Sequence, residues 1–520
     1  MPSVNFKYLS YIIVIVFLAY TPILFNGFVL DDHLFNYENT YYKSWSNLPR
    51  LFQNDCITQG VESLMINGND KGPAFTSYRP FQSLTYFFDY SFWGDNPLGC
   101  HITNVLIHCL NCILVYKIII WILGDSLIGL FAALLFGLHP IQSEAVAVMS
   151  YRVDLIATFF ILLSFYAWLK FQKGDYAHKK YYLGSLAAYF LALFTKESSI
   201  VFPLVVFFYD YLLTISQRKL RHKIIYYLGF LPILFFYLCV YIFVFPDSCV
   251  HWRWLGGHFS THLFTMGTIW YGYCIDFLIP WRIHLMPTAY THPLPSSLLI
   301  GTFKIIMALT MVGAILFRFF RSFKLGAFFL LWSLIFYIPV SNIIPLANPV
   351  GYRFMYLPSL GILTLEAVFL FKIVFSDFVK KYFQRLAFSL LSGVLAGCFM
   401  LTVFLNTKWK DDFTIANTWL EHSPSSTKGL LIKAEVYYYQ GRYQQAEIFY
   451  VRDYNLGDRN PFLLYHLGKC YLGQGELEKA KGCFLELTHR VPKFLDAYIL
   501  LDQIHIKSGG KSIGNFKNLD

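Results

Sequence analysis

Apolar segments follow one another through most of residues 9–405, and the acidic and basic side chains gather in the turns between them. A helix that crosses a bilayer needs about 20 apolar residues, because the hydrocarbon offers no water to pair with an open backbone. The sequence therefore predicts an all-α fold, a polytopic membrane helical bundle of about 11 spans. The predicted spans are 9–29, 101–122, 127–139, 155–171, 180–195, 199–216, 224–246, 296–317, 325–340, 355–374 and 386–405.

The composition is typical of a membrane protein. Hydrophobic residues make up 56% of the chain and charged residues 14%, whereas soluble domains carry about 25% charged residues. The first apolar segment, Leu9 to Leu30, is longer than the hydrophobic region of a signal peptide and lacks a small-residue cleavage site, so we expect a retained membrane helix. The net charge of +11 is spread over short loops, which argues against a nucleic-acid partner. Of the ten Cys residues, Cys109 and Cys112 have CxxC spacing, but both lie in an apolar run where we expect small core side chains. No metal centre is predicted, and a divalent cation as cofactor has no support in the sequence.

The basic side chains also predict the orientation of the bundle. Clusters of Lys and Arg occupy alternate connections, at 170–180, 218–223, 318–324 and 372–385. Since such loops stay on the cytosolic side, the N-terminus is predicted inside, and the polar turns and the C-terminal tail outside. A further span at 264–280 would reverse this pattern. We therefore interpret residues 247–295 as one outer excursion that contains a re-entrant or interfacial helix.

The tail differs in character from the preceding chain and carries a repeat of about 34 residues. The domain prediction is a membrane domain at 1–405 and a soluble domain at 406–520. A repeat unit that starts at Pro461 has small or apolar residues at the positions typical of a tetratricopeptide unit, namely Leu464, Leu467, Gly468, Tyr471, Gly475, Ala480, Phe484 and Pro492. The predicted tetratricopeptide-type α-solenoid has repeats near 427–460 and 461–494 and a partial repeat at 495–510. A plain helical hairpin is the alternative. Such repeats form concave peptide-binding faces, so an acceptor protein is a candidate partner.

Several short polar motifs recur in a fixed order along the chain. They are Asp31-Asp32-His33, Ser77-Tyr78-Arg79-Pro80, His101-x-x-Asn104-x-x-x-His108, His139-Pro-Ile-Gln-Ser-Glu144-Ala-Val, Arg152-Val-Asp154, Lys196-Glu197, Ser341-Asn342 and Tyr352-Arg353. This order, with an outer repeat tail, resembles the tetratricopeptide-bearing, TMTC-like branch of the GT-C glycosyltransferases and its bacterial relatives. The segment 247–295 matches this pattern poorly, and Tyr151 stands where the eukaryotic members usually have Gly.

The resemblance implies a GT-C-like membrane enzyme of the inverting type. Such an enzyme moves a sugar from a polyprenyl-phosphate carrier to a hydroxyl group on the outer or lumenal face. In the eukaryotic members the sugar is mannose and the acceptor is a protein Ser or Thr. The implied partners are the polyprenyl-phosphate-linked sugar, the acceptor protein and the lipid bilayer. The implied location is a bacterial inner membrane with a periplasmic tail, or the endoplasmic reticulum membrane for a eukaryotic chain.

Asp31 and Asp32 are the predicted catalytic residues, because a hydroxyl group that attacks an anomeric carbon needs a carboxylate to take its proton. Two adjacent acids repel each other, so one can have a raised pKa while the other stays ionised as the base. The alternative is that the pair caps the next helix or solvates the start of the loop.

The leaving phosphate needs cations or hydrogen-bond donors directed at its oxygens. The predicted donor phosphate ligands are Arg79, Arg152, Lys196 and Arg353. An Arg guanidinium matches a phosphate with two parallel hydrogen bonds. Three of the cations also have an alternative role: Arg79 as an interface anchor, Lys196 in a salt bridge with Glu197, and Arg353 in a packing group with Tyr352 and Tyr356.

A further set of residues is predicted to support the site: His139, Glu144, Asp154, Glu197, His101 and His108. Glu144 is alternatively a structural ion-pair partner of Arg152. His101, Asn104 and His108 share one helix face, where interhelical hydrogen bonding competes with a metal site.

Two rival classes of function remain open from the sequence. One is a ligase that moves a whole lipid-linked glycan. The other is a non-enzyme, either a transporter or a membrane-anchored repeat scaffold. A transporter tends to show paired halves with matching Gly or Pro breaks, and the sequence has no such internal symmetry. A scaffold would not need acids and cations on one face.

Overall fold

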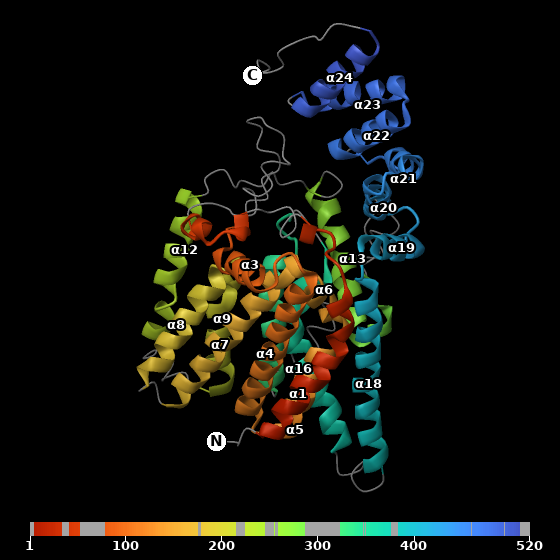
Figure 1. Cartoon of the computed structure of the whole chain (residues 1–520). Coiled ribbons are helices and arrows are strands. Elements are labelled where there is room, and N and C mark those ends of the chain that lie inside the picture. Colours follow the sequence, from red (N-terminus) through yellow and green to blue (C-terminus); the bar gives the residue numbers. More distant parts are fainter. Residues whose placement is uncertain are drawn as a thin grey trace. The chain divides into compact units, whose positions relative to one another are not determined.

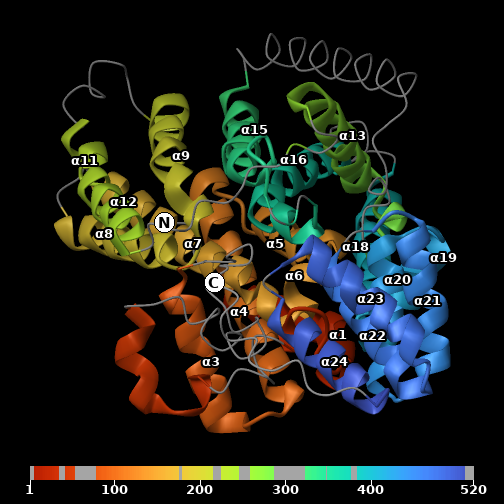
Figure 2. The same cartoon turned by 90° about the horizontal axis from the view of Figure 1, so that it is seen from above.

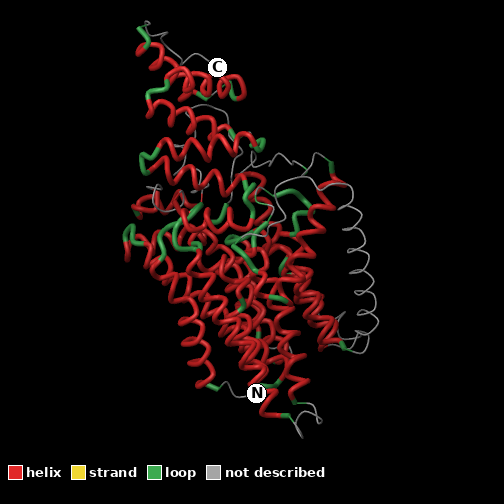
Figure 3. The backbone as a smooth tube through the Cα atoms, turned by 90° about the vertical axis from the view of Figure 1, so that its right-hand side faces the viewer, coloured by secondary structure: helices red, strands yellow, loops and turns green. Residues whose placement is uncertain are grey.

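All regular structure in the described part of the chain is helical, as expected from the sequence (Figure 3). The computed structural model describes residues 5–33, 41–52, 78–174, 178–214, 224–244, 254, 258–285, 323–346, 348, 350–375, 383–458, 460–492 and 494–509. The chain divides into two compact units, the first formed by Met1–Cys56 and Thr76–Trp409, while the second contains Lys410–Asp520. The boundary in the structure, after Trp409, lies four residues beyond the predicted one at 405.

The first unit is a bundle of helices joined by short 3-10 turns (Figure 1). Its α-helices are α1 (Phe6–Tyr20), α3 (Pro80–Trp93), α4 (Pro97–Leu123), α5 (Ser126–Leu138), α6 (Ser143–Ala147), α7 (Arg152–Lys173), α8 (Lys179–Leu193), α9 (Phe202–Tyr209), α11 (Ile224–Leu228), α12 (Leu231–Val244), α13 (Phe259–Leu278), α15 (Lys324–Tyr337), α16 (Tyr356–Val374) and α18 (Gln384–Lys408). The short turns that carry site residues are η1 (Thr21–Phe25), η5 (Pro140–Gln142), η6 (Met149–Tyr151), η7 (Glu197–Val201) and η11 (Tyr352–Met355).

Seven helical segments of the described chain are long and apolar enough to cross a membrane, which agrees with a multi-pass membrane protein. They are Phe6–Phe25, Pro97–Leu123, Met149–Lys173, Glu197–Thr214, Ile224–Phe243, Tyr352–Val374 and Gln384–Lys408. The predicted span 127–139 forms a bent pair, in which Ser126–Leu138 and Pro140–Ala147 meet at 49°. The predicted spans at 180–195 and 325–340 correspond to the shorter helical segments α8 and Lys324–Val340. The predicted span 296–317 lies outside the described residues.

α4 and α7 form the centre of the bundle, with α1, α5 and α16 packed around them (Figure 2). Of the most apolar 18-residue windows, 61% of that in α4 and 67% of that in α7 is buried, compared with 11% in Ile224–Phe243. α12 is therefore a peripheral helix, and its exposed Phe235, Phe236 and Phe243 are suited to contact with lipid.

A proline breaks the chain at the polar end of the bundle. α5 ends at Leu138, and His139 takes an extended conformation because the ring of Pro140 disfavours the helical region for the preceding residue. The His139 Nδ1 atom accepts a hydrogen bond from the Ile141 amide at 3.3 Å. Residues 139–151 then form three short helical turns whose residues are all buried. This buried connection supplies the floor of the site described below.

The predicted outer excursion at 247–295 contains one described α-helix, α13, of 20 residues. α13 is tied to the connection between α15 and α16 by hydrogen bonds from its polar side chains. The Tyr273 hydroxyl donates to the Gly351 carbonyl at 3.1 Å, and the Trp270 indole donates to the Ser341 carbonyl at 3.1 Å.

The second unit is a row of helical hairpins. Its helices are α19 (Asp412–His422), α20 (Thr427–Tyr439), α21 (Tyr443–Asn455), α22 (Pro461–Gln474), α23 (Leu477–Arg490) and α24 (Leu495–Lys507). α20, α22 and α24 begin at the three residues from which the repeats were counted. Gly468 lies where α22 crosses α23, and a Cβ atom there would lie 2.6 Å from the Phe484 ring, so this crossing requires glycine.

Candidate functional site

The turn that carries the two acids is held by hydrogen bonds of Asp32, one of those acids. Asp32 closes it twice, because its amide donates to the Val29 carbonyl at 2.9 Å and its Oδ2 atom accepts from the Val29 amide at 3.3 Å. Within this turn Leu30 has a φ of 51°, a left-handed conformation that costs a residue with a side chain about 1–2 kcal/mol. The strained turn reverses the chain and places Asp31 and Asp32 in different surroundings.

Asp32 is fully buried and binds the backbone of η6, which is far away in the sequence. Its Oδ1 atom accepts from the Ser150 amide at 2.7 Å, and its Oδ2 atom accepts from the Met149 amide at 3.2 Å. Burial raises the pKa of Asp32 to about 6, and the hydrogen bonds from Ser150, Met149 and Val29 oppose this increase. Asp31 is half-buried. Of the two predicted bases, Asp31 is therefore the one with access to an acceptor.

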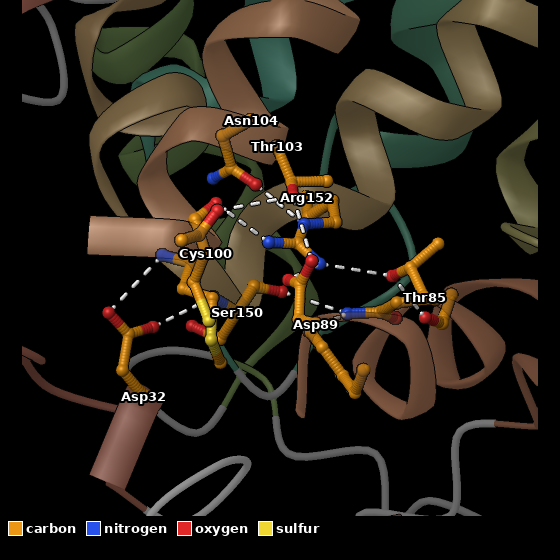
Figure 4. A network of polar contacts seen from close by, with 12 residues as sticks. Asp32, Thr85, Asp89, Cys100, Thr103, Asn104, Ser150 and Arg152 are labelled. Carbon is orange, nitrogen blue, oxygen red and sulfur yellow. Dashed lines mark hydrogen bonds and ion pairs between the residues drawn. The ribbon is translucent and has the colours of Figure 1, made fainter. Parts of the chain in front are cut away.

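Arg152 has protein partners in place of the phosphate that we expected. Its side chain is fully buried, and its Nη1 atom lies 2.5 Å from the Asp89 Oδ2 atom on α3. The Nε atom donates to Asn104 Oδ1 at 2.6 Å and the Nη2 atom donates to the Cys100 carbonyl at 2.8 Å (Figure 4). A guanidinium enclosed in this way anchors α7 to α3 and α4.

Glu144 pairs with Arg353, which corrects the expected pair of Glu144 and Arg152. The Arg353 Nη1 atom donates to Glu144 Oε1 at 2.6 Å, and the Tyr352 amide donates to Glu144 Oε2 at 2.6 Å. The backbone of Gly351 passes close to this pair. A Cβ atom on Gly351 would lie 2.8 Å from Arg353 Nη1 and 2.9 Å from Glu144 Oε1. The absence of a side chain at 351 therefore makes room for the ion pair.

Arg353 and Lys196 approach the same aromatic ring. The Arg353 guanidinium lies 3.9 Å from the centroid of the Tyr151 ring and 4.7 Å from that of Phe354. The Lys196 ammonium lies 5.6 Å from the Phe354 centroid. Arg353 thus has the aromatic contacts that were the alternative to phosphate binding, but with the rings of Tyr151 and Phe354 in place of Tyr352 and Tyr356.

The two members of the Lys196-Glu197 motif have separate partners. The Lys196 ammonium pairs with Asp154 in α7. Glu197 binds Arg79, whose Nε and Nη2 atoms donate to the two carboxylate oxygens at 3.2 and 2.7 Å. The salt bridge between Lys196 and Glu197, which was the alternative role of this motif, is therefore replaced by the pairs Lys196–Asp154 and Arg79–Glu197. The two neighbouring residues instead contact two different motifs, because Lys196 binds Asp154 of α7 and Glu197 binds Arg79.

The histidines have positions suited to interhelical contact. His108 lies between a hydroxyl and a carbonyl group, with Nδ1 2.6 Å from the Tyr356 hydroxyl and Nε2 3.1 Å from the Gly137 carbonyl. His101 is buried within α4, and His139 is buried with its ring 5.8 Å from that of Phe277. Among the described residues, no group of three or more His, Cys, Asp or Glu side chains could hold a metal ion.

The structure adds a residue that the sequence reasoning missed. Asp89 is the only acid in α3, a helix that otherwise carries aromatic and small polar side chains. Its carboxylate is buried against Arg152 and accepts from the Thr103 hydroxyl at 2.7 Å. A single acid within an aromatic helix was the available signal, since a buried carboxylate normally requires a cationic partner.

The polar end of the bundle brings the sequence motifs together through consecutive residues. The amide of Ser150 binds Asp32, and the ring of Tyr151 contacts Arg353. Asp154, one turn later, binds Lys196. Asp32 of the first motif and two of the predicted phosphate ligands, Arg353 and Lys196, are therefore arranged along the segment from 150 to 154.

Comparisons with known proteins are consistent with the resemblance inferred from the motifs. Residues 85–243 match the family model of dolichyl-phosphate-mannose-protein mannosyltransferases. Protein O-mannosyl-transferase TMTC3 of Homo sapiens is 25% identical over 466 residues, which is 82% of this chain and 49% of that protein. TMTC3 of Mus musculus is 30% identical over 34% of this chain and 18% of that protein. These matches confirm the predicted resemblance.

The chain spans about half the length, or less, of the curated relatives that it matches. TMTC2 of Homo sapiens, for example, is 37% identical over 18% of this chain and 11% of that protein. Among solved structures, the chain is similar to ArnT from Cupriavidus metallidurans bound to undecaprenyl phosphate. That similarity has a TM-score of 0.42 and 14% identity, and it covers 81% of this chain and 80% of that chain.

Proposed function

We propose that this protein is an inverting membrane glycosyltransferase that moves a sugar, mannose by analogy with its relatives, from a polyprenyl-phosphate carrier to a protein Ser or Thr hydroxyl. The observation that carries this proposal is that two consecutive residues, Ser150 and Tyr151, contact the acidic turn and a cation, respectively. Ser150 binds Asp32 and Tyr151 contacts Arg353, so the turn that carries the proposed base, Asp31, and a proposed phosphate ligand lie side by side. The similarity to protein O-mannosyl-transferases supports the choice of sugar and acceptor.

Asp31 acts as the general base in this proposal. It is half-buried, whereas Asp32 is fully buried and bound to three backbone amides. Asp31 takes the proton of the acceptor hydroxyl as its oxygen attacks the anomeric carbon. The bond between that carbon and the phosphate oxygen breaks, the polyprenyl phosphate leaves with the bonding electrons, and the configuration inverts.

Arg353 and Lys196 bind the leaving phosphate. Glu144 engages the Nη1 atom of Arg353, and Asp154 engages one of the three ammonium hydrogens of Lys196. In this proposal the remaining donors of both side chains bind the phosphate oxygens, and the paired carboxylates keep the cations in place before the sugar donor arrives. Arg79 lies nearer to solvent, with 22% of its side chain exposed, and steers the anionic headgroup towards the site.

The orientation of the chain follows from its basic loops. The loops rich in Lys and Arg are cytosolic, and the site faces the outer or lumenal side of a bacterial inner membrane or of the endoplasmic reticulum. The helical hairpins of the second unit hold the acceptor polypeptide, in the manner of other concave repeat proteins.

The test is transfer by the purified protein in lipid nanodiscs. We expect labelled mannose to move from a polyprenyl-phosphate donor to a Ser- and Thr-rich polypeptide. Asp31→Asn should lower kcat by about 100-fold or more, the scale of general-base contributions, with little change in donor affinity. Asp32→Asn is the comparison. We expect a smaller loss of kcat for this variant, because the side-chain amide oxygen of the new Asn still accepts a hydrogen bond from a backbone amide. Full activity of Asp31→Asn would refute the assignment of the base, and transfer only of preassembled glycans would favour a ligase.

A further inference from the structure

The backbone that holds Asp32 is itself held from the opposite side. Asn104, in the N-terminal third of α4, donates from Nδ2 to the Val146 carbonyl at 3.0 Å and to the Val148 carbonyl at 3.3 Å. The Val148 carbonyl and the Met149 amide belong to one peptide group. Asn104 therefore binds the oxygen end of the same peptide whose N–H binds the Asp32 carboxylate at 3.2 Å.

Asn104 is in turn fixed by the buried ion pair. Arg152 donates from Nε to Asn104 Oδ1 at 2.6 Å, and its Nη1 atom lies 2.5 Å from the Asp89 carboxylate. A continuous chain of polar contacts thus runs from Asp89 through Arg152, Asn104 and the 148–149 peptide to Asp32 (Figure 4). All four of these side chains are buried. In a medium of low dielectric constant each donor polarises the next, which strengthens every bond by about 10–30%.

We propose that Asn104 is a positioning residue for the catalytic turn, because its bond to the Val148 carbonyl orients and polarises the peptide that binds Asp32. This proposal rests on the proposed function and deepens it. Asn104 is fully buried and its side chain binds protein groups, so its role in the proposed reaction is indirect. It acts through Asp32, which closes the strained turn at Leu30 and so sets the direction of Asp31.

The consequence is a dependence of activity on pH. Since the pKa of Asp32 is raised to about 6, its ionised form exists above this pH and is lost as the pH falls through about 6. A protonated Asp32 cannot accept all three hydrogen bonds from the backbone amides. Activity should therefore fall on the acid limb of the pH–activity profile. Without Asn104, the hydrogen bond from the Met149 amide to the Asp32 carboxylate weakens. The carboxylate then loses part of the stabilisation that opposes burial, and the acid limb should move to higher pH.

Other titratable groups surround Asp32 and must be separated from it. On its own turn these are Asp31 and His33, and the groups that interact with it from other elements are Tyr86 of α3, Cys100 of α4 and Tyr151 of η6. Phenols and thiols ordinarily ionise above pH 8, so they do not contribute to an acid limb. Asp32→Asn identifies the part of the limb that belongs to Asp32, because the change leaves Asp31 and His33 in place.

The chain contains a matched control on the same helix. Asn111, two turns after Asn104 in α4, is also fully buried, and its Nδ2 atom donates to the Leu155 carbonyl at 3.0 Å and to the Tyr356 hydroxyl at 3.1 Å. Asn104→Leu and Asn111→Leu therefore remove the same kind of group from the same helix. We expect Asn104→Leu to lower kcat by about 10-fold, to leave the donor KM within about twofold, and to move the acid limb up by about 0.5 pH. Asn111→Leu should leave the acid limb unchanged.

A second measurement does not depend on activity. Thermal melting of the full chain at pH 7.5 is compared for Asn104→Leu, Asp32→Asn and the double variant. Coupled residues give a double variant that melts higher than additivity predicts, here by about 2 °C or more, whereas Asn111→Leu and Asp32→Asn should be additive. If Asn104→Leu fails to fold because it leaves Arg152 short of an acceptor, Asn104→Asp is the substitute. Its carboxylate still accepts from the Arg152 Nε atom, but it has no amide hydrogen to donate to the Val148 carbonyl.

Equal losses of kcat in the two Leu variants, with the acid limb unmoved and both melting cycles additive, would overturn the positioning role. A wild-type protein without transferase activity would instead reject the proposed function. The melting cycle would then decide by itself whether Asn104 supports Asp32.

Discussion

A single methyl group at Gly351 tests whether the Glu144–Arg353 pair binds the donor. Gly351 has φ 174° and ψ 140°, an extended conformation that alanine adopts without strain. The effect of Gly351→Ala is therefore steric, since the new Cβ atom would lie 2.8 Å from Arg353 Nη1 and 2.9 Å from Glu144 Oε1. Contacts under 3.0 Å require one of the two side chains to move.

Neither side chain can move without breaking a contact. The Arg353 guanidinium is held 3.9 Å from the Tyr151 centroid and 4.7 Å from that of Phe354, and Glu144 is held by the Tyr352 amide at 2.6 Å. A hydrogen bond to a charged group contributes about 1.5–3 kcal/mol, which corresponds to a factor of about 10 to 150 in binding. We expect Gly351→Ala to raise the donor KM by about this factor, with a smaller effect on kcat, because the displaced guanidinium no longer meets the phosphate.

The assay is the initial rate of sugar transfer as a function of donor concentration at saturating acceptor. Gly393→Ala is the matched control, because a Cβ atom at this position in α18 meets nothing within 4 Å. A donor KM within about twofold of wild type for Gly351→Ala, in a protein that melts at the wild-type temperature, would refute the role of Arg353 in phosphate binding.

Three further predictions concern the second unit and the orientation of the chain. Burial, together with the nearby Asp458 carboxylate, raises the pKa of Asp453 from its ordinary value near 4 to about 8; the neutral form is the more stable one in the fold, so hydrogen-exchange protection of α21 should be highest below about pH 4, decrease between about pH 4 and pH 8 and level off above that, and Asp453→Asn should abolish this dependence. Gly468→Ala would place a Cβ atom 2.6 Å from the Phe484 ring and should destabilise the α22–α23 hairpin by about 1–3 kcal/mol, measured by denaturant-dependent proteolysis of the tail; unchanged protease resistance would contradict the close crossing. A cysteine introduced at Ser425 should react with an impermeant label only from the outer side of sealed vesicles, and labelling from the cytosolic side would reverse the proposed orientation.

The helical class and the ends of many elements could be predicted from local sequence alone. Apolar runs of about 20 residues admit only helices in a bilayer, and the spacing of Leu464, Gly468 and Phe484 anticipated the hairpin from α22 to α23. The bend at His139 also has a local cause, since Pro140 restricts the residue before it. These features depend on residues within one or two turns of each other, so the pattern in the sequence is sufficient to predict them.

The partners of the charged residues were decided by the tertiary structure. Neighbours in the sequence suggested that Glu144 pairs with Arg152 and Lys196 with Glu197. The structure instead pairs Arg152 with Asp89, and Glu144 with Arg353, which is 209 residues away. An ion pair forms between whichever charged groups meet at the polar end of the bundle, because a buried charge needs a partner within a few ångströms. The helix packing that brings these groups together is the sum of many weak apolar contacts, which no motif encodes. The same packing buries Asp32 and leaves Asp31 accessible, a distinction that two identical adjacent residues could not carry by themselves.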